Sequence, residues 1–365
     1  MTLSASRAES YHRCPFQYFC RFGLQAKPRK EADFDPLFRG SAVHSVLEHL
    51  LRDQGVDALL ALAPPERRRL LDEEMDRYAA EFLRGENLPE RVRYLFRRLR
   101  EILAQVLERL LAEFASSAFR PAAFELVIDR DRPVQPYVIP LEDGGELRMR
   151  GVVDRVDCAV VAGVPYFRVV DYKSGGKTFD LSEVYDGLNL QMLIYLFSLW
   201  ESGAPPAADA LPAGILYVPT KDPVLRQSGR DEDPEKLAAE KRKENRAGGL
   251  LLEDEGVLCA MEADARGIYL PAHRKSGGAL AGPLVTLGQL GRLKRKADGI
   301  LADMARNLRR GAVPALPYQK GQHSACESCD FAAACGRETG EPARWAKEMK
   351  FEDAKQLLEE EADDA

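Results

Sequence analysis

The sequence predicts an α/β fold, in which a mixed central sheet is flanked by helices. Between about residues 120 and 220, short runs rich in β-branched residues alternate with Gly, Pro and Asp, as strands and their turns do. An apolar helical segment, "EVYDGLNLQMLIYLFSLWESG", lies between two such runs, "VPYFRVVDYKSG" and "AGILYVP". Before the strands, from Pro64 to about Ser117, apolar residues recur at helical spacing. Helices therefore both precede and interrupt one sheet.

The composition indicates a chain that can build a core. Its 365 residues are 45% hydrophobic and 30% charged, which argues against global disorder. The length suits one large domain with insertions, or two ordinary domains. The formal net charge is −6, but five acidic residues lie in the last seven positions, and removing those five charges leaves −1. Net charge therefore favours neither the presence nor the absence of a nucleic-acid partner, although a local basic patch can still bind phosphates.

The N-terminus and the cysteines indicate a cellular location. The opening residues, "MTLSASRAESYHRC", lack the apolar core of a secretory signal. No apolar run approaches the ~18 residues that a membrane span needs, so we expect a cytoplasmic protein without a membrane partner. In that reducing compartment, seven cysteines favour metal binding or free thiols over disulfides.

We expect a single domain over residues 1–350, followed by an acidic tail. A helix is expected to begin after Gly40, where apolar residues gather on one face. The expected segments are a helical subregion at about 45–118, a sheet core at 120–220, a mobile charged loop or exposed helix at 221–250, a C-terminal helix and cysteine segment at 284–340, and the acidic tail at 351–365.

Asp171 and Lys173, in "VVDYKSG", are the first candidate site residues. On a strand, residues two apart point to the same side, so the carboxylate and the ammonium group lie together. A carboxylate holds a divalent metal, and a lysine supplies positive charge to an attacking water or a developing phosphorane. This pair alone is weak evidence, because a surface ion pair has the same pattern.

Asp154, in "RGVVDRVD", strengthens the metal interpretation. Two adjacent strands in a hairpin can bring Asp154 close to Asp171. Sharing Mg²⁺ or Mn²⁺ relieves the repulsion between two such carboxylates. The alternative is an ordinary aspartate in a surface turn.

Polar residues on two helices are further candidates. Gln191 and Tyr195 form an i, i+4 pair in an otherwise apolar segment. Either they lie at the edge of the core with their polar ends in solvent, or they point at the site and hold a phosphate or Lys173. His44, in "FRGSAVHSVLEHLL", is either structural or a metal ligand, with Mn²⁺ favoured over Mg²⁺.

Arg93, Arg97 and Arg100 share one face of the long Leu- and Arg-rich helix. Two interpretations are open for this face. It is either a solvated polar surface, which is the more common case, or a stripe that contacts DNA phosphates.

Together these motifs resemble the RecB-like branch of the PD-(D/E)xK nuclease superfamily. The matching pieces are the helix histidine in "GSAVHSVLEHL", then "GVVDRVD", "VVDYKSG" and "LQMLIYL", in the order found in the family. The resemblance implies a restriction-endonuclease-like core with helical insertions. It also implies metal ligation by His44, Asp154, Asp171 and the Tyr172 carbonyl. Lys173 is then the catalytic lysine, Gln191 and Tyr195 form the accessory motif, and Glu125 in "FELVIDR" is a further acidic contributor.

The cysteine segment "ACESCDFAAAC" resembles the end of AddB-type members of this branch, which carry one cysteine near the start of the domain and three near its end. The resemblance implies a [4Fe–4S] cluster on Cys14, Cys326, Cys329 and Cys335, which staples the two ends of the domain together. Four thiolates also suit structural Zn²⁺. Cys20 is the one rival to Cys14, but it lacks the "CPF" context.

The expected activity is metal-dependent hydrolysis of DNA, as an exonuclease on single-stranded ends during double-strand-break processing. By resemblance, the strand degraded is the one with the 5′ end, and the partner is an AddA-type helicase–nuclease. The sequence has no GxxxxGK[ST] loop, so no ATPase activity is expected from this chain, which is either an excised domain or a stand-alone relative. The alternatives are a CRISPR-adaptation-type iron–sulfur nuclease and a non-catalytic DNA-binding scaffold.

Overall fold

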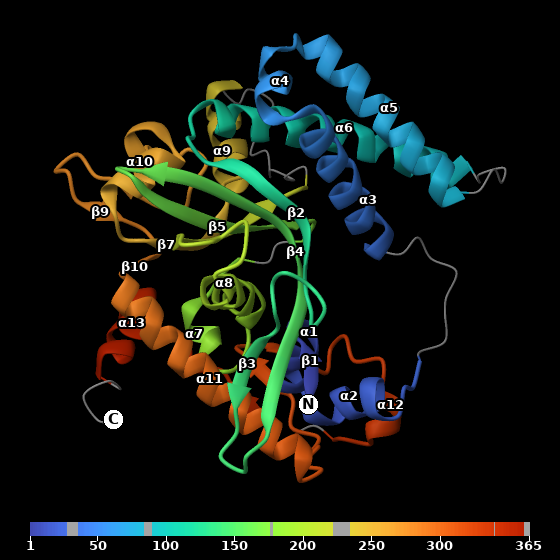
Figure 1. Ribbon diagram of the computed structural model, residues 1–365. Helices are drawn as coiled ribbons and strands as arrows, with labels where there is room; N and C mark the ends of the chain where they lie inside the picture. Colours follow the sequence, from blue (N-terminus) through green and yellow to red (C-terminus); the bar gives the residue numbers. More distant parts are fainter. Residues whose placement is uncertain (28–35, 84–89, 176–177, 222–233, 339, 361–365) are drawn as a thin grey trace.

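The computed structural model describes residues 1–27, 36–83, 90–175, 178–221, 234–338 and 340–360. Within these ranges, an eight-stranded mixed sheet forms the middle layer and helices cover both of its faces (Figure 1). This layered arrangement is the α/β fold with a central mixed sheet that the sequence predicts.

The strands of the main sheet are β1 (Thr2–Ser4), β2 (Arg120–Ile128), β3 (Tyr137–Pro140), β4 (Glu146–Val161), β5 (Val164–Lys173), β6 (Leu211–Pro219), β7 (Gly248–Leu252) and β10 (Leu284–Val285). The long strand β4 organises this sheet, because β1, β2, β3 and β5 all pair with it. β6 then runs parallel to β5, β7 antiparallel to β6, and β10 parallel to β7. Smaller sheets join β8 (His273–Arg274) to β9 (Leu280–Ala281), and β11 (Tyr318–Lys320) to β12 (His323–Ser324) and β13 (Arg344–Trp345).

Each face of the sheet has its own hydrophobic core and its own helices. The first core contains residues of α1 (Ala5–Arg13), α7 (Leu181–Val184), α8 (Leu190–Ser202), α11 (Leu287–Arg309) and α13 (Phe351–Glu360). The second contains residues of α3 (Pro36–His49), α4 (Val56–Ala61), α5 (Pro64–Leu83), α6 (Glu90–Ala115) and α10 (Glu255–Met261). The remaining helical segments are α2 (Pro15–Tyr18), η1 (Phe19–Gly23), η2 (Leu50–Gln54), α9 (Pro234–Glu244), η3 (Ala263–Ala265) and α12 (Ala332–Cys335).

The hairpin of β4 and β5 sets the register of the candidate site. Val161 pairs with Val164 at the turn, and Arg155 pairs with Val170 further along. The next position of this ladder places Asp154 opposite Asp171, as the hairpin interpretation of the sequence requires.

A buried network of charges lies directly behind this hairpin. Arg155 Nε donates to Asp157 Oδ1 at 2.7 Å, and Arg168 Nε donates to Asp157 Oδ2 at 2.9 Å. Arg168 Nη2 also donates to Glu113 Oε1 on α6 at 2.8 Å. The side chains of Arg155, Asp157 and Arg168 have no exposed surface. These pairs join α6 to the two strands that carry the predicted site.

The structure describes part of two predicted segments. Within 221–250, expected as a mobile charged loop or an exposed helix, helix α9 carries exposed residues such as Lys236 and Lys243 and strand β7 begins at Gly248, while 222–233 lie outside the described residues. The segment expected as an acidic tail forms helix α13 over its first ten residues. Ala354 and Leu358 of α13 are buried, because this helix packs on α11 and α7. Residues 361–365 lie outside the described residues.

In the described part of the chain, no helix has both the length and the apolar character that crossing a membrane requires.

Candidate active site

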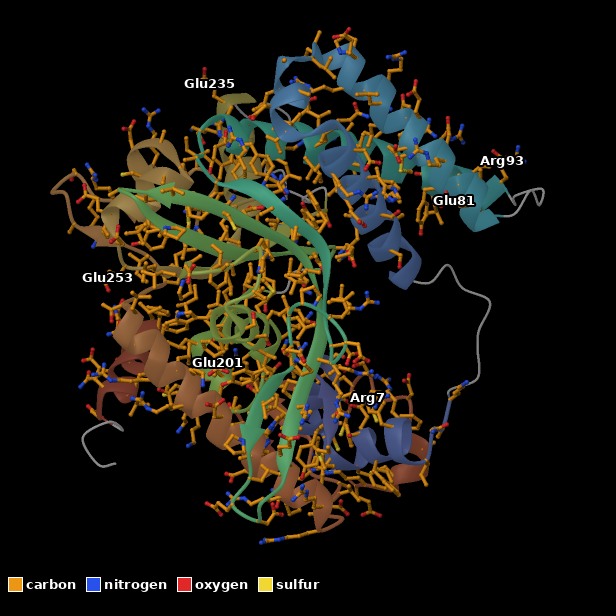
Figure 2. The ribbon with its side chains drawn as sticks, viewed as in Figure 1. Arg7, Glu81, Arg93, Glu201, Glu235 and Glu253 are labelled. Carbon is orange, nitrogen blue, oxygen red and sulfur yellow. The ribbon has the colours of Figure 1, made fainter. Side chains whose placement is uncertain are left out.

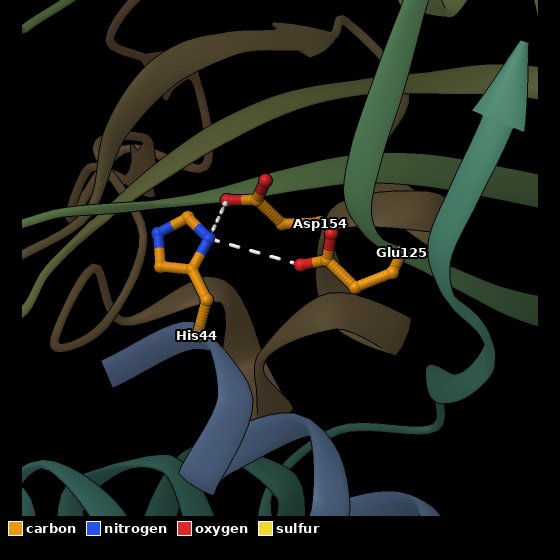
Figure 3. A group of neighbouring side chains, drawn as sticks. All are labelled: His44, Glu125 and Asp154. Carbon is orange, nitrogen blue, oxygen red and sulfur yellow. Dashed lines mark ion pairs between the residues drawn. The ribbon is translucent and has the colours of Figure 1, made fainter. Parts of the chain in front are cut away.

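His44, Glu125 and Asp154 converge from three different elements (Figure 3). One ligand atom from each of the three residues lies within 4.8 Å of the other two. His44 Nδ1 on α3 is 3.5 Å from Asp154 Oδ2 on β4 and 3.8 Å from Glu125 Oε1 on β2. One imidazole and two carboxylates form a donor set that suits Mn²⁺ or Mg²⁺.

Glu125 reaches this group through an unusual backbone conformation. Its φ is +43°, a left-handed value that a non-glycine residue seldom adopts. The neighbouring residues pair regularly, Phe124 with Arg155 and Leu126 with Val153, so Glu125 is the strand position beside Asp154. Strain of this kind costs about 1–3 kcal/mol and is typical of functional sites. Sequence reasoning included Glu125 only as a further acidic residue, because nothing in a strand pattern signals a left-handed residue.

His44 is also joined to the strand that follows. Its Nε2 is 3.0 Å from the backbone carbonyl oxygen of Tyr172. Although burial by itself lowers the pKa of His44, the neighbouring carboxylates of Glu125 and Asp154 raise it to about 9. A protonated imidazole donates from Nε2 to the Tyr172 carbonyl oxygen, while its Nδ1 faces the carboxylates of Asp154 and Glu125.

Asp154 is held by the backbone of the neighbouring strand. The Tyr172 N–H donates to Asp154 Oδ2 at 2.9 Å. Burial, together with the nearby charge of Asp171, raises the pKa of Asp154 to about 7. Crowding of buried carboxylates is the electrostatic condition that a bound cation relieves.

Asp171 and Lys173 lie side by side, as the period of a strand predicts. Lys173 Nζ is 2.8 Å from Asp171 Oδ1 and 2.6 Å from Oδ2. The Asp171 residue is only 3% exposed, whereas the Lys173 side chain is 23% exposed. The ammonium group also lies 5.6 Å from the centre of the Tyr217 ring. Burial of the carboxylate distinguishes this pair from an ordinary surface ion pair.

Gln191 and Tyr195 contact each other on α8. Gln191 Nε2 lies 3.4 Å from Tyr195 OH. The Tyr195 ring lies against Gly151 of β4, where an added methyl group would come within 2.6 Å of the tyrosine hydroxyl oxygen. Because Gly151 has no side chain, the Tyr195 ring can pack directly against the sheet at this position, three residues before Asp154. Glu9, which sequence reasoning missed, accepts a hydrogen bond from Gln191 N at 3.2 Å and so anchors the first turn of α8.

Arg93, Arg97 and Arg100 each have a carboxylate neighbour. Arg93 and Arg97 lie 3.3 and 3.8 Å from Glu90, and Arg100 lies 3.6 Å from Asp72. Figure 2 shows Arg93 at the outer end of the α5–α6 pair. Contact between these arginines and DNA remains a prediction, and any such contact would compete with these ion pairs.

The cysteines chosen from the sequence line one pocket of about 190 Å³. These residues are Cys14, Cys326, Cys329 and Cys335. The rival Cys20 is buried but is not among the lining residues.

The two ends of the chain are also joined around this pocket. Phe16 N donates to Pro314 O at 3.1 Å, and Tyr11 OH donates to Ala312 O at 3.1 Å. Arg21 lies 2.6 Å from Asp330. The first and last parts of the domain therefore meet where the four thiols lie.

Comparison with known proteins identifies relatives over almost the whole chain. Residues 2–336 match the family model described as the PD-(D/E)XK nuclease superfamily. An ATP-dependent helicase/deoxyribonuclease subunit from Clostridium acetobutylicum is 30% identical over 374 residues, which cover 99% of this chain and 32% of that protein. The proteins of the same name from Thermoanaerobacter sp. (strain X514) and Acetivibrio thermocellus are each 31% identical, and cover 99% and 92% of this chain. This chain matches 32% and 30% of their lengths, so it spans about a third of the curated relatives it matches.

Proposed function

This chain belongs to the PD-(D/E)XK nuclease superfamily, and we propose that it is a deoxyribonuclease that hydrolyses phosphodiester bonds with Mg²⁺ or Mn²⁺. The observation that carries the proposal is the convergence of His44, Glu125 and Asp154 beside the Asp171–Lys173 pair. An acidic, partly buried group next to a lysine is what metal-assisted attack on a phosphodiester requires.

The proposed metal ligands are His44, Asp154, Asp171 and the Tyr172 carbonyl, with Glu125 as a further acidic contributor. The fit is supported by the donor set and by the raised pKa of Asp154, because both favour a cation among these oxygens. When bound, the metal would activate water and neutralise charge on the phosphate. The protein would hold the metal in place, since α3, β2, β4 and β5 each supply a donor.

Lys173 is proposed to stabilise the negative charge that develops on the phosphate. Its side chain is partly exposed, and its ammonium group contacts the Asp171 carboxylate and lies over the Tyr217 ring. A fixed positive charge of this kind acts without reorganisation during the reaction. Gln191 and Tyr195 are proposed to orient the phosphate or Lys173 from α8.

We also propose that Cys14, Cys326, Cys329 and Cys335 bind a [4Fe–4S] cluster with a structural role. The support is that all four cysteines line one pocket, so that a single bound group can reach all of them, and that the resemblance to AddB-type members implies a cluster there. Zinc held by four thiolates is the alternative.

The proposed biological role is exonuclease action on single-stranded DNA ends in double-strand-break repair. The support is the name of the relatives, which are helicase/deoxyribonuclease subunits. We therefore propose an AddA-type helicase–nuclease as the partner, the strand with the 5′ end as the substrate, and no ATPase activity in this chain.

The test is cleavage of single- and double-stranded oligonucleotides that carry a label on either the 5′ or the 3′ end. We expect Mg²⁺- or Mn²⁺-dependent shortening of single strands that chelation by EDTA stops. Release of labelled mononucleotides from the 5′ end first would support the proposed polarity, and release from the 3′ end first would reverse it. No cleavage with either metal, alone or with the helicase partner, would contradict the proposed activity.

A further inference from the structure

A basic pocket lies between α6 and α9, apart from the residues of the candidate active site. It has a volume of about 220 Å³. Four of the lining side chains are cationic: Arg109, Lys221, Lys241 and Arg242. None of the described side chains that line it is acidic, although the whole chain has a net charge of −6.

The cations of this pocket are available to a ligand. Among the residues that the structure describes, no carboxylate lies within ion-pair distance of Lys221, Lys241 or Arg242. This distinguishes them from Arg93 and Arg100 on α6, which are paired with Glu90 and Asp72. Unpaired cations in a concave site attract an anion more strongly than cations on a flat surface, because the low-dielectric walls focus their field.

A buried amide adds a second polar group to the pocket. Asn245 lines it, and the side-chain oxygen of Asn245 is buried with no hydrogen-bond partner among the described residues. A buried polar group without a partner costs free energy unless a ligand or water satisfies it. Rotation of the amide by half a turn would present its N–H groups to an anion instead.

The pocket adjoins the strand that carries Lys173. Thr220 N donates to the Lys173 carbonyl oxygen at 2.9 Å, and Lys221 is the next residue. Arg109 Nη2 donates to the carbonyl oxygen of Pro219, the register partner of Lys173 on β6. Arg109 is thus bonded to the end of β6, and the backbone of Lys221 follows closely after that end.

We propose that the pocket of Arg109, Lys221, Lys241 and Arg242 binds a backbone phosphate of the DNA strand beside the cleavage site. This inference rests on the proposed function, since it assigns a further contact to the same substrate. The ligand is a phosphodiester, because the several cations that face one cavity complement its negative charge. The pocket lies at the end of the strand that carries Lys173, where a DNA strand that continues past the active site would pass.

The test is binding of a fluorescent single-stranded oligonucleotide in EDTA, where cleavage is blocked, at several salt concentrations. The variant is Lys241→Gln/Arg242→Gln, and the matched control is Lys236→Gln/Lys243→Gln. Both variants replace two exposed residues of α9 and remove two positive charges, but Lys236 and Lys243 do not line the pocket. Circular dichroism melting checks that both variants are folded.

We expect the pocket variant to bind the oligonucleotide more weakly than wild type does, whichever oligonucleotide sequence is tested. Its slope of log affinity against log salt should fall by about 0.7, as expected when one phosphate of a single strand is no longer neutralised. The control variant should keep the wild-type slope. Inorganic phosphate should displace the oligonucleotide no better than chloride at equal ionic strength.

Each of the other possible results would overturn one specific claim. Equal slopes for the two variants would overturn the phosphate pocket and leave the nuclease proposal intact. Selective displacement by inorganic phosphate would replace the DNA strand by a free phosphate ligand. Salt-dependent binding that requires Lys241 and Arg242, in a protein that cleaves nothing, would support the pocket and contradict the nuclease activity. A wild-type protein that binds no oligonucleotide would overturn both.

Discussion

His44 Nε2 lies 3.0 Å from the carbonyl oxygen of Tyr172, which is 128 residues further along the chain. Nδ1 of the same ring faces Asp154 and Glu125. One imidazole therefore contacts β2, β4 and β5, and it links the helical region to the hairpin of β4 and β5.

Removing this imidazole should weaken metal binding. We expect His44→Ala to lower the affinity for Mn²⁺ at least about tenfold, since even partners of metal ligands contribute that much. The measurement is the rise in melting temperature on Mn²⁺ titration. His49→Ala is the matched control, because His49 lies on the same helix but 3.7 Å from Glu74. An unchanged titration in His44→Ala would remove His44 from the ligand set.

Lys173→Met should abolish cleavage without unfolding the protein. The methionine keeps most of the apolar stem but removes the charge, so we expect the rate to fall by about 10²-fold or more. Cleavage of an end-labelled single strand measures the loss, and circular dichroism checks the fold. Lys355→Met on α13, which breaks only an ion pair with Glu253, should cleave normally. Wild-type rates for Lys173→Met would exclude a catalytic role.

Gly151→Ala should displace the Tyr195 ring. The added methyl group would lie 2.6 Å from the Tyr195 hydroxyl oxygen, so either the ring or the strand must move. We expect a loss of about 1–3 kcal/mol in the free energy of unfolding, measured by urea denaturation, together with lower activity. Gly299→Ala on α11 has no atom within 4 Å and should be neutral or slightly stabilising. Equal stability of both variants would mean that Tyr195 is free to move aside.

Cys14→Ser should lose the proposed cluster, and Cys20→Ser should keep it. Only Cys14 lines the pocket with the three C-terminal cysteines. After anaerobic purification, we expect about four irons per chain in the wild type and in Cys20→Ser, and a loss of iron in Cys14→Ser. Full iron content in Cys14→Ser would show that another residue completes the site, and stoichiometric zinc in the wild type would reject the cluster.

Asp157→Asn should destabilise the fold strongly, because it leaves Arg155 and Arg168 buried without their shared carboxylate. The expected cost is about 3–5 kcal/mol in the free energy of unfolding. Asp57→Asn breaks an exposed ion pair with Arg120 and should change stability little.

The same network predicts a pH dependence. Burial alone would raise the pKa of Asp157, but the charges of Arg155 and Arg168 lower it below the ordinary value of 3.8. A lowered folded-state pKa stabilises the protein above 3.8, and this contribution is lost as the pH falls through the folded-state value. The stability difference between wild type and Asp157→Asn should therefore narrow only below pH 3.8. A difference that narrows already near neutral pH would contradict this assignment.

Much of the site could be predicted because its motifs are local. The two-residue period of a strand places Asp171 beside Lys173, and the short distance along the chain to Asp154 predicts a hairpin. The resemblance of these motifs to a nuclease family is confirmed by the match over residues 2–336. The buried Arg155–Asp157 pair was missed, because charged residues in a strand ordinarily predict exposure.

The sequence by itself determined the order of helices and strands, the family and the spacing of the carboxylates and cysteines. These features depend on neighbours along the chain, and backbone periodicity is enough to express them. Only the tertiary structure decided that Glu125 turns toward His44, that Arg100 is neutralised by Asp72, and that Arg109 and Lys241 line the same pocket. The physical reason is that these relationships depend on how separate elements pack. Side chains far apart in the sequence meet their oppositely charged partners only once those elements have packed together.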